Sequence, residues 1–385
     1  MTRGVAASRE LLVFADDWGR HPSSCQHLVK RLQPHYRILW ANTIGTRSPK
    51  ADRFTLRRGV EKLNSWRHGL RQVADSMWVV DLPMLPKIGH PLARGASRQL
   101  VTWRLRQVFR QIDMSRPTVL TTLPFVQSLI RGLPRAGLVY YCTDDYSQWP
   151  GAEREALANM ERETATAANL ILAVSRPLEA RLRSLARCEY FPHGVDCGHF
   201  ALAQSATIAP AIAALPQPRI GFFGLIYEKL DFGLLSAVAR ANPEGSLCMI
   251  GRVDHCPESF RSISNVHFLE AQPYADLPEW LAGLDVLLLP YVDDEMIRQS
   301  CPLKLRECLA SGKPTVSVSV AEVNRFVPHV RVGEDHEAFV AAVRQSLSES
   351  PDEGGARQAA VADDDWDKKA GQLRHQLDAI AAAAR

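Results

Sequence analysis

The chain has 385 residues, of which 46% are hydrophobic and 23% are charged. This composition is typical of a globular protein with enough apolar residues for two cores. No apolar run approaches the roughly 20 residues that a membrane-spanning helix needs, and residues 1–15 lack the pattern of a signal peptide. The eight cysteines form no CxxC pair and show no metal-ligand spacing, which indicates free thiols in a reducing cytoplasm.

The net charge of +4 is distributed unevenly along the chain. Residues 1–150 hold 23 Lys and Arg against 10 Asp and Glu, whereas the remainder holds 23 against 32. The basic excess is greatest between Arg47 and Arg116, which predicts an anionic partner for the first half. No nucleic-acid-binding motif accompanies this charge, so nucleic acid is not the partner that we expect.

Six short apolar runs in the first half alternate with helical patterns. They are LLVFAD (11–16), YRILWA (36–41), MWVVDL (77–82), TVLTTL (118–123), GLVYYC (137–142) and NLILAV (169–174). Strands rich in Val, Ile and Leu that are each followed by a helix predict a parallel, doubly wound sheet.

Within this half, SRQLVTWRLRQVFRQI (97–112) predicts a basic amphipathic helix. Leu100, Trp103 and Val108 are expected to share its apolar face. The arginines that border this face are Arg98, Arg104, Arg106 and Arg110. Such a helix either lies on an anionic membrane surface or packs on its own sheet, and both interpretations remain open.

The alternation breaks at ALAQSATIAPAIAALPQP (201–218), a segment of low charge that we interpret as an interdomain linker. It resumes with RIGFFG (219–224), SLCMIG (246–251), NVHFL (265–269), DVLLLP (285–290) and PTVSV (314–318). We therefore expect two Rossmann-like domains and a final alanine-rich helix. Their predicted bounds are 1–200 for the N-terminal domain, 219–364 for the C-terminal domain and 365–385 for the helix.

Polar residues that follow strands are candidate site residues, because ligands of such sheets bind at the carboxyl ends of the strands. Asp144 and Asp145 follow GLVYYC, where a carboxylate is placed either to act as a general base toward a sugar hydroxyl or to cap a turn. Arg20 and His21 follow LLVFAD and are candidates to contact an anion or an acceptor. Their loop is not a GxGxxG fingerprint, which counts against a nicotinamide-dependent dehydrogenase.

Glycine and lysine residues follow the first strand of the second half. Gly224 would let backbone N–H groups approach a phosphate, and Lys229 could supply positive charge. In the loop at 270–290, backbone groups could read a base edge, with Tyr274 available for packing.

The stretch SCPLKLRECLASGKP predicts a helix that Ser300 caps and that ends before Gly312. Lys304 and Glu307 lie one turn apart near its start, where anions are favoured. Taken alone, this pair is an ordinary surface ion pair worth about 0.3 kcal/mol.

Several stretches occur in an order that resembles retaining and related glycosyltransferases of the GT-B fold. They are HGVD, GFFG, a strand ending in IGR, NVHFLEAQPYADLPEWLAGLDVLLLPY and PLKLRECLASGKPTV. The text is most similar to glycosyltransferase family 4 and its bacterial polysaccharide-assembly relatives, and YYCTDDYS is similar to a motif of exopolysaccharide glucuronosyltransferases. The resemblance implies an α/β fold of two Rossmann-like domains that face each other across a cleft, with a C-terminal helix that crosses back to the first domain.

The resemblance also implies roles for individual residues. Glu307 would accept hydrogen bonds from the ribose hydroxyls of a nucleotide sugar, and Lys304 would lie near its diphosphate. The other implied donor-binding residues are Gly224, Lys229, Gly251, Tyr274, Gln299 and Leu305. Asp144 would be the base or acceptor-orienting carboxylate, with Asp145 as the second candidate. The acceptor-side candidates are Arg20, His21 and His193.

Two positions depart from the pattern of the family. Gln299 stands where a second glutamate is usual, and Leu225 stands where an arginine often follows the glycine turn. Lys229 is therefore the expected phosphate cation. No DxD metal motif follows a strand, because Asp293 and Asp294 lie in a loop.

We expect a cytoplasmic, membrane-peripheral glycosyltransferase that needs neither a metal ion nor a cofactor beyond its nucleotide-sugar substrate. It would move sugar from a UDP or GDP sugar to a glycan or lipid-linked glycan in the synthesis of cell-surface or exopolysaccharide. The alternatives are a nucleotide-sugar epimerase of the same fold and a degenerate, non-catalytic subunit of a polysaccharide complex.

Overall fold

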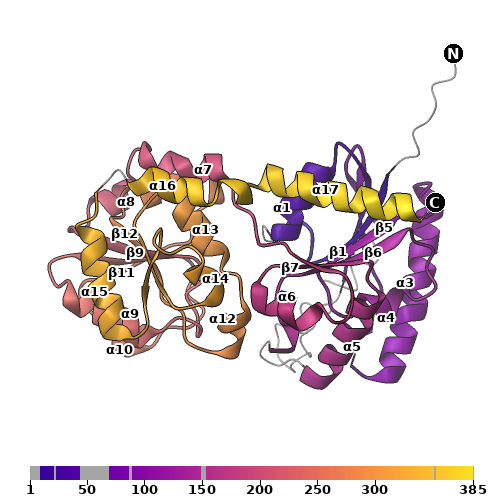
Figure 1. Ribbon diagram of the computed structural model, residues 1–385, viewed down its shortest axis with the longest axis horizontal. Helices are drawn as coiled ribbons and strands as arrows, with labels where there is room; N and C mark the ends of the chain where they lie inside the picture. The colour runs from indigo at the N-terminus through magenta and orange to yellow at the C-terminus, as the bar shows by residue number, and fades with distance from the viewer. Residues whose placement is uncertain are drawn as a thin grey trace, which may run out of the picture. The chain divides into compact units, whose positions relative to one another are not determined.

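The structure is a computed structural model that describes residues 9–20, 23–43, 69–85, 89–148, 153–350 and 353–384. It divides into two compact units (Figure 1). Unit 1 comprises Met1–Pro192 with Asp367–Arg385, and unit 2 comprises His193–Trp366. His21 and residues 44–68, which include much of the basic segment, lie outside the described residues. Among the helices that are described, none is long and apolar enough to cross a membrane.

Unit 1 contains an eight-stranded sheet in the order β3-β4-β2-β1-β5-β6-β7-β8. The strands are β1 (Glu10–Ala15), β2 (Arg37–Asn42), β3 (Leu70–Ala74), β4 (Met77–Asp81), β5 (Thr118–Thr121), β6 (Gly137–Cys142), β7 (Leu170–Ala173) and β8 (Cys188–Tyr190). Every pairing is parallel except that of β3 with β4. The parallel sheet expected from the apolar runs is therefore confirmed.

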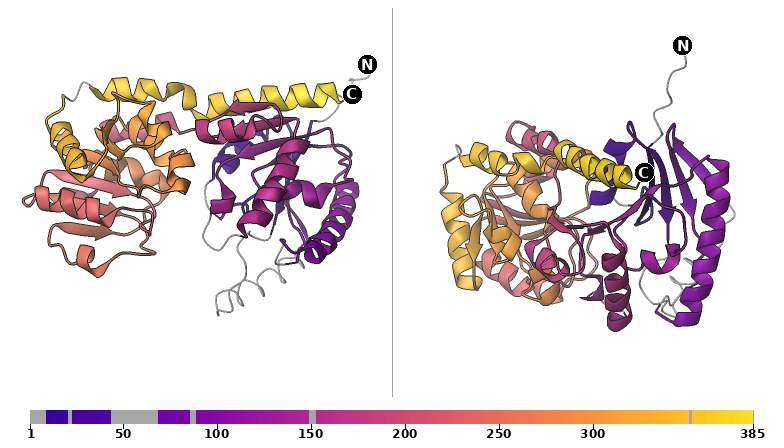
Figure 2. Two further views of the ribbon diagram at one scale, coloured as in Figure 1. Left: turned by 60° about the horizontal axis from the view of Figure 1, so that its bottom comes forward. Right: turned by 45° about the vertical axis from the view of Figure 1, so that its right-hand side comes forward.

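Helices cover both faces of this sheet (Figures 1 and 2), which explains why its central strands are apolar throughout. In β1, the residues from Leu11 to Ala15 are at most 1% exposed. Within the described residues, the helices of unit 1 are α1 (Ser24–Leu32), α3 (Pro91–Gln111), α4 (Val126–Ile130), η1 (Tyr146–Gln148), α5 (Arg154–Ala167), α6 (Arg176–Leu182) and most of α17 (Trp366–Ala383).

Unit 2 contains a six-stranded parallel sheet in the order β11-β10-β9-β12-β13-β14. The strands are β9 (Arg219–Phe223), β10 (Ser246–Ile250), β11 (Val266–Leu269), β12 (Val286–Leu289), β13 (Thr315–Val318) and β14 (Arg331–Gly333). Successive side chains alternate between two apolar clusters, because Met249 belongs to one and Ile250 to the other. The core of unit 2 therefore lies on both faces of its sheet.

The helices of unit 2 are short apart from two. They are α7 (Cys197–Ala201), η2 (Leu202–Gln204), α8 (Pro210–Ala213), α9 (Phe232–Ala241), α10 (Glu258–Arg261), η3 (Tyr274–Asp276), α11 (Leu277–Ala282), α12 (Glu295–Gln299), α13 (Leu303–Ala310), α14 (Ala321–Asn324), α15 (His336–Leu347), α16 (Glu353–Ala360) and η4 (Ala362–Asp364). The longest are α15, with 12 residues, and α9, with 10.

Residues 201–218 are part of unit 2 and not the free linker that their composition suggested. The segment contains η2 and α8, and Ala203, Ala209 and Ile212 are buried in one of the apolar clusters of this unit. Alanine and proline are common in linkers, but here the small side chains pack closely against the core. The chain passes from unit 1 to unit 2 earlier, after Pro192.

The chain returns to unit 1 through α17, as the resemblance implied (Figure 1). The Tyr36 hydroxyl donates a hydrogen bond to Asp378 (2.6 Å), and Gln376 donates one to Glu189 (2.8 Å). Leu373 and Leu377 of this helix are fully buried. The first and last segments of the chain therefore share one core.

Candidate functional site

Two glycines shape the carboxyl ends of neighbouring strands in unit 2. Gly224 follows β9 with a φ of +138°, and Gly251 follows β10 with a φ of +145°. A Cβ atom on Gly251 would lie 1.8 Å from the carbonyl oxygen of Gly224, so no side chain fits there. A Cβ atom on Gly224 would lie 3.0 Å from Cε of Lys304. The glycine turn therefore passes directly beneath Lys304, and the N–H groups of Gly224 and Gly251 donate to the carbonyl oxygens of Ile250 and Leu269 (both 2.9 Å).

The helix α13 begins beside this turn, but not at the residue predicted to cap it. Ser300 ends the preceding helix, where its hydroxyl donates to the carbonyl oxygen of Ile297 (2.8 Å). The N-cap of α13 is Pro302, which offers no side-chain cap. The first-turn N–H groups of α13 therefore lack the usual side-chain acceptor and carry the positive end of the helix dipole. Gly312 follows the helix with a φ of +72°, as predicted.

Lys304 and Glu307 form an ion pair with 2.7 Å between Nζ and Oε2. Glu307 is only 6% exposed, and the Lys304 ammonium also lies 4.5 Å from the centre of the Phe223 ring. This pair is therefore not the exposed surface pair that the spacing alone would suggest. The carboxylate of Glu307 is therefore buried and is held by Lys304 beside the glycine turn.

Leu305 contributes to this region differently from the implied donor contact. Its side chain is fully buried in the apolar core of unit 2. Its N–H donates to the carbonyl oxygen of Pro302 (3.1 Å), and the residue helps to fix α13 on the sheet.

Lys229, the expected phosphate cation, is already engaged by Asp294 at 2.5 Å. Asp294 also caps α12 by accepting a hydrogen bond from the N–H of Ile297 (2.9 Å). Burial opposes ionisation of Asp294, but the bonds from Lys229 and Ile297 outweigh it and lower the pKa of this carboxyl. A phosphate would therefore have to compete with Asp294 for Lys229.

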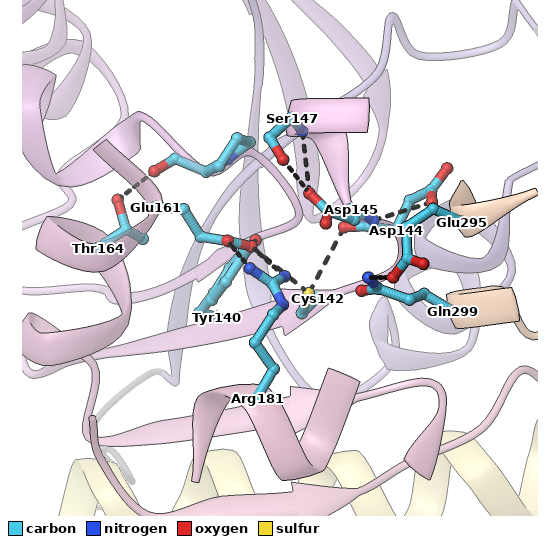
Figure 3. Close-up of polar contacts among 11 residues, drawn as sticks. Tyr140, Cys142, Asp144, Asp145, Ser147, Glu161, Thr164, Arg181, Glu295 and Gln299 are labelled. Atoms are coloured by element: carbon cyan, nitrogen blue, oxygen red, sulfur yellow. Dashed lines mark hydrogen bonds and ion pairs between the residues drawn. The ribbon is translucent and has the colours of Figure 1, made fainter. Parts of the chain in front are cut away.

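Gln299 lies at the end of α12, where its side-chain amide donates to Glu295 at 2.6 Å (Figure 3). A carboxylate is thus in contact with the position where the family has its second glutamate. Glu295 is not among the predicted site residues, although its spacing of four residues from Gln299 on a helix is a signal that could have identified the pair.

The HGVD stretch and Tyr274 have packing roles in unit 2. A Cβ atom on Gly194 would lie 2.4 Å from the Trp366 ring, so glycine allows this tryptophan to pack. His193 is 8% exposed and adjoins this contact. The Tyr274 ring stacks on His199 with centroids 4.6 Å apart. Tyr274 therefore packs on a side chain of its own unit, and its contact with a donor base stays a prediction.

Asp144 and Asp145 follow β6 in unit 1 but have different environments (Figure 3). Asp145 is 3% exposed, and its carboxylate accepts hydrogen bonds from the N–H (3.0 Å) and the hydroxyl (2.6 Å) of Ser147. Asp145 therefore caps a turn, which was the structural alternative for this pair. Asp144 is partly exposed and accepts a hydrogen bond from the N–H of Asp145 (2.8 Å). Of the two residues, Asp144 is the more exposed.

An ion pair between Glu161 and Arg181 lies near the Asp144 loop (Figure 3). Glu161 of α5 is 5% exposed, accepts a hydrogen bond from the Tyr140 hydroxyl (2.8 Å) and pairs with Arg181 at 2.5 Å. The Cys142 thiol contacts the carbonyl oxygen of Asp144 (3.6 Å), and burial raises the pKa of this thiol. No sequence spacing pointed to this cluster, because its members come from three separate elements.

Of the remaining acceptor-side candidates, the structure describes Arg20 but not His21. Arg20 is exposed and pairs with Asp17 at 3.6 Å. His21 lies outside the described residues. Within the described part of the chain, no group of three or more His, Cys, Asp or Glu side chains is arranged to hold a metal ion.

Part of the chain matches a known protein family. Residues 217–349 match the family model described as glycosyl transferases group 1. A protein of Bacillus subtilis (strain 168) assigned to teichuronic acid biosynthesis as glycosyltransferase TuaH is 28% identical over 142 residues. The aligned part is 35% of this chain and 36% of that relative, so it spans about a third of the relative's length.

Solved structures resemble almost the whole chain. Sucrose-phosphate synthase from Thermosynechococcus elongatus has a TM-score of 0.70 at 14% identity and covers 96% of this chain and 99% of its own. The trehalose 6-phosphate synthase of Burkholderia multivorans has a TM-score of 0.68 at 12% identity, and the match covers 98% of each chain. Anabaena Alr3699/HepE in complex with UDP and glucose has a TM-score of 0.62 at 14% identity, and the match covers 96% of this chain and 99% of that one. The GT-B fold and the resemblance to GT-B glycosyltransferases are therefore confirmed.

Proposed function

We propose that this chain is a GT-B glycosyltransferase that moves a sugar from a UDP or GDP sugar to a glycan or lipid-linked glycan in the synthesis of cell-surface polysaccharide. The observation that carries the proposal is the half-buried Lys304–Glu307 pair above the Gly224 turn. This pair lies within the 217–349 segment that matches the glycosyl transferases group 1 model. The resemblance to a teichuronic acid glycosyltransferase supports the polysaccharide class of acceptor.

In this proposal, unit 2 binds the donor. Glu307 accepts hydrogen bonds from the two ribose hydroxyls, since a carboxylate has two oxygens to match a diol. Lys304 and the uncapped start of α13 offset the negative charge of the diphosphate as it leaves, so the reaction proceeds without a metal ion. Lys229 joins them only if the diphosphate displaces Asp294.

Unit 1 binds the acceptor in this proposal, and Asp144 is the carboxylate that acts on it. The acceptor oxygen bonds to the anomeric carbon while the bond from that carbon to the diphosphate breaks. The electron pair leaves with the nucleotide, and the hydroxyl proton passes to Asp144. Its partial exposure at the end of β6 supports this role, whereas the carboxylate of Asp145 is engaged by Ser147.

We further propose that the enzyme is family 4-like and works in the cytoplasm on the inner face of the plasma membrane. Support for the membrane contact comes from α3, which carries five arginines and no acidic residue. Leu92 and Trp103 of this helix are 79% and 57% exposed. Apolar side chains among arginines suit an anionic lipid surface.

Calorimetry with UDP and with GDP tests the donor site. We expect one nucleotide to bind, and Glu307→Ala to weaken its affinity by at least about tenfold, because a charge-assisted pair of hydrogen bonds is lost. Glu337→Ala, which alters an exposed glutamate at the start of α15, is the matched control and should leave the affinity unchanged. Absence of binding to either nucleotide would refute the proposal.

Incubation of the same protein with a nucleotide sugar, with and without acceptor, separates the epimerase from the non-catalytic subunit. An epimerase would convert a nucleotide sugar without any acceptor. A non-catalytic subunit would bind nucleotide or partner but release no sugar product; Gln299 and Leu225 are the departures that motivate this alternative.

A further inference from the structure

A polar cluster lies at the point where the sheet of unit 1 changes direction. From β1 the chain builds outward through β2 and β4 on one side, and from β5 through β6, β7 and β8 on the other. In sheets of this kind, ligands bind outside the carboxyl ends of the two strands at such a switch point. Asp16 follows β1 directly, and Thr122 follows β5 and donates its N–H to the Phe14 carbonyl oxygen (3.0 Å).

Asp16 is exposed, yet both of its carboxylate oxygens are held in place. Oδ1 accepts a hydrogen bond from the Ser23 hydroxyl (2.9 Å), and Oδ2 accepts one from the side-chain amide of Gln26 (2.9 Å). Gln26 is itself 2% exposed, and its amide oxygen accepts from the N–H of Gly19 (3.1 Å). A buried amide therefore orients an accessible carboxylate, which can accept further hydrogen bonds through its other lone pairs.

The hydroxyl of Tyr146 lies close to those of two threonines that follow β5 and β6. Its hydroxyl lies 3.5 Å from that of Thr143 and also interacts with the hydroxyl of Thr122. Burial raises the pKa of Tyr146, and the negative charges of Asp144 and Asp16 raise it further. Its hydroxyl therefore stays protonated between the loops that follow β1, β5 and β6, within electrostatic reach of both carboxylates.

We propose that Asp16 is a second acceptor-binding carboxylate, which accepts a hydrogen bond from one hydroxyl of a neutral saccharide beside the hydroxyl that Asp144 deprotonates. This inference rests on the proposed glycosyltransferase function and names the acceptor class for it. Asp16 does not take up the transferred proton; it fixes the orientation of the acceptor ring.

The chemistry of the cluster favours a neutral sugar ring. The polar groups at this edge of the sheet are the carboxylates of Asp16 and Asp144 and the hydroxyls of Thr122, Thr143 and Tyr146. Carboxylates and hydroxyls exchange hydrogen bonds with the hydroxyl groups of a saccharide. A uronate or phosphate on the reacting ring would bring a further negative charge close to two carboxylates, which disfavours it.

An array of immobilised oligosaccharides tests this inference on the full chain. It should carry neutral gluco-, galacto- and manno-configured ends together with the same ends bearing uronate or phosphate. We expect the wild-type protein to bind neutral ends, and Asp16→Asn to bind them at least about tenfold more weakly because a charge-assisted hydrogen bond is lost. Asp17→Asn, which changes the neighbouring carboxylate, should bind as wild type does.

Parallel calorimetry with UDP and GDP distinguishes this inference from the proposed function. All three proteins should bind nucleotide equally. Equal saccharide binding by Asp16→Asn, binding of charged ends alone, or no saccharide binding by the wild type would each overturn the inference while the donor site stands. Loss of nucleotide binding by the wild type would instead refute the proposed function. Tyr146→Phe provides a second variant, and it should also weaken saccharide binding.

Discussion

At the scale of single residues, the partner of a side chain decides its role more than its type does. Asp144 and Asp145 are adjacent and chemically identical, yet Asp145 is engaged by Ser147 and Asp144 is partly exposed. Lys229 and Lys304 both lie near the strand ends of unit 2, but their partners differ. Asp294 caps α12 and is partly exposed, whereas Glu307 lies in α13 and is buried. Each of these differences predicts a different response to substitution.

Replacing each aspartate separately by asparagine distinguishes a catalytic role of Asp144 from a turn-forming role of Asp145. Asp144→Asn should lower the rate of sugar transfer by about 100-fold or more, because it removes a general base, while nucleotide affinity is unchanged. Asp145→Asn should keep transfer activity but reduce the free energy of unfolding by about 1 kcal/mol, since a capping carboxylate is weakened. Turnover assays and urea unfolding measure the two effects. Wild-type turnover in Asp144→Asn would contradict the base assignment.

Removal of Lys304 should destabilise unit 2 as well as weaken donor binding. Lys304→Met leaves the carboxylate of Glu307 buried without its cation, at a cost of about 2–3 kcal/mol in the free energy of unfolding. The double variant with Glu307→Gln should recover part of this loss, because the uncompensated charge is gone. Urea unfolding of the two single variants and the double variant gives the coupling energy. Additive losses would show that the pair does not act as a unit.

At the scale of elements, α3 shows how helical periodicity assigns a face. The predicted apolar face comprises Leu100, Trp103 and Val108, but the structure buries Val108 and leaves the other two exposed. The buried face follows the spacing of Val101, Leu105 and Val108, which recur at four and three residues. The predicted apolar face was therefore wrong, and the correction leaves Trp103 on the solvent side.

A groove of about 520 Å³ runs along this exposed face. Its lining includes Arg98, Trp103, Arg106, Arg110 and Arg131. Arg131 lies just beyond α4 and pairs with Glu163 at a distance of 4.0 Å. An indole surrounded by guanidinium groups suits the boundary between lipid headgroups and acyl chains.

Vesicle flotation tests whether α3 contacts lipid. The double variant Arg106→Gln/Arg110→Gln should bind vesicles that contain phosphatidylglycerol about 10- to 30-fold more weakly, since each arginine near the surface contributes about 1 kcal/mol. Arg240→Gln/Arg344→Gln removes the same charge from exposed positions on α9 and α15 and is the control. Equal losses in the two variants, or equal binding to neutral vesicles, would contradict a docking role for α3.

The cap of α12 predicts a dependence on pH. The pKa of Asp294 is lowered in the folded state, so its ionised form stabilises the fold above the unfolded value of about 3.9. This contribution is lost as the pH falls through the folded value. Asp294→Asn should therefore be less stable than wild type at pH 7, and the difference should shrink below about pH 4. Asp276→Asn, at a position without a side-chain cap, should show no such change in urea unfolding.

Some elements were predictable from sequence and others were not. The central strands β1 and β6 are continuous apolar runs because both sheet faces are covered, and this pattern is visible in the sequence. The edge strand β3 is polar and largely exposed, so it resembles a loop. The proximity of Lys304 to Glu307 follows from helical spacing, whereas Glu161 and Arg181 meet only because α5 and α6 pack against the same sheet.

At the scale of the whole molecule, unit 1 is made of two distant segments of the chain. The helix α17 supplies Leu373 and Leu377 to its core and Asp378 to a pair of polar contacts with Arg9 and Tyr36. Unit 2 is continuous from His193 to Trp366. Unit 1 therefore needs α17 to complete its core, whereas unit 2 does not.

Core substitutions in α17 should destabilise unit 1 selectively. Leu373→Ala and Leu377→Ala should each lower its free energy of unfolding by about 2–4 kcal/mol, because each leaves a cavity in a buried contact. Gln372→Ala, at an exposed position on the same helix, is the control. Hydrogen exchange followed by mass spectrometry reports the two units separately, and loss of protection in β1 and β8 without change in β9 and β10 is the expected result. Uniform loss in both units would contradict this assignment.

The discontinuity of unit 1 also constrains its biogenesis. During translation the ribosome must synthesise all of unit 2 before α17 emerges. Until then, the surface that receives Leu373 and Leu377 has no covering helix, and the nascent sheet exposes an apolar patch that is a target for chaperones. Unit 2 has all of its own segments by Trp366 and is free to fold first. The domain that begins the chain is thus the last to be completed.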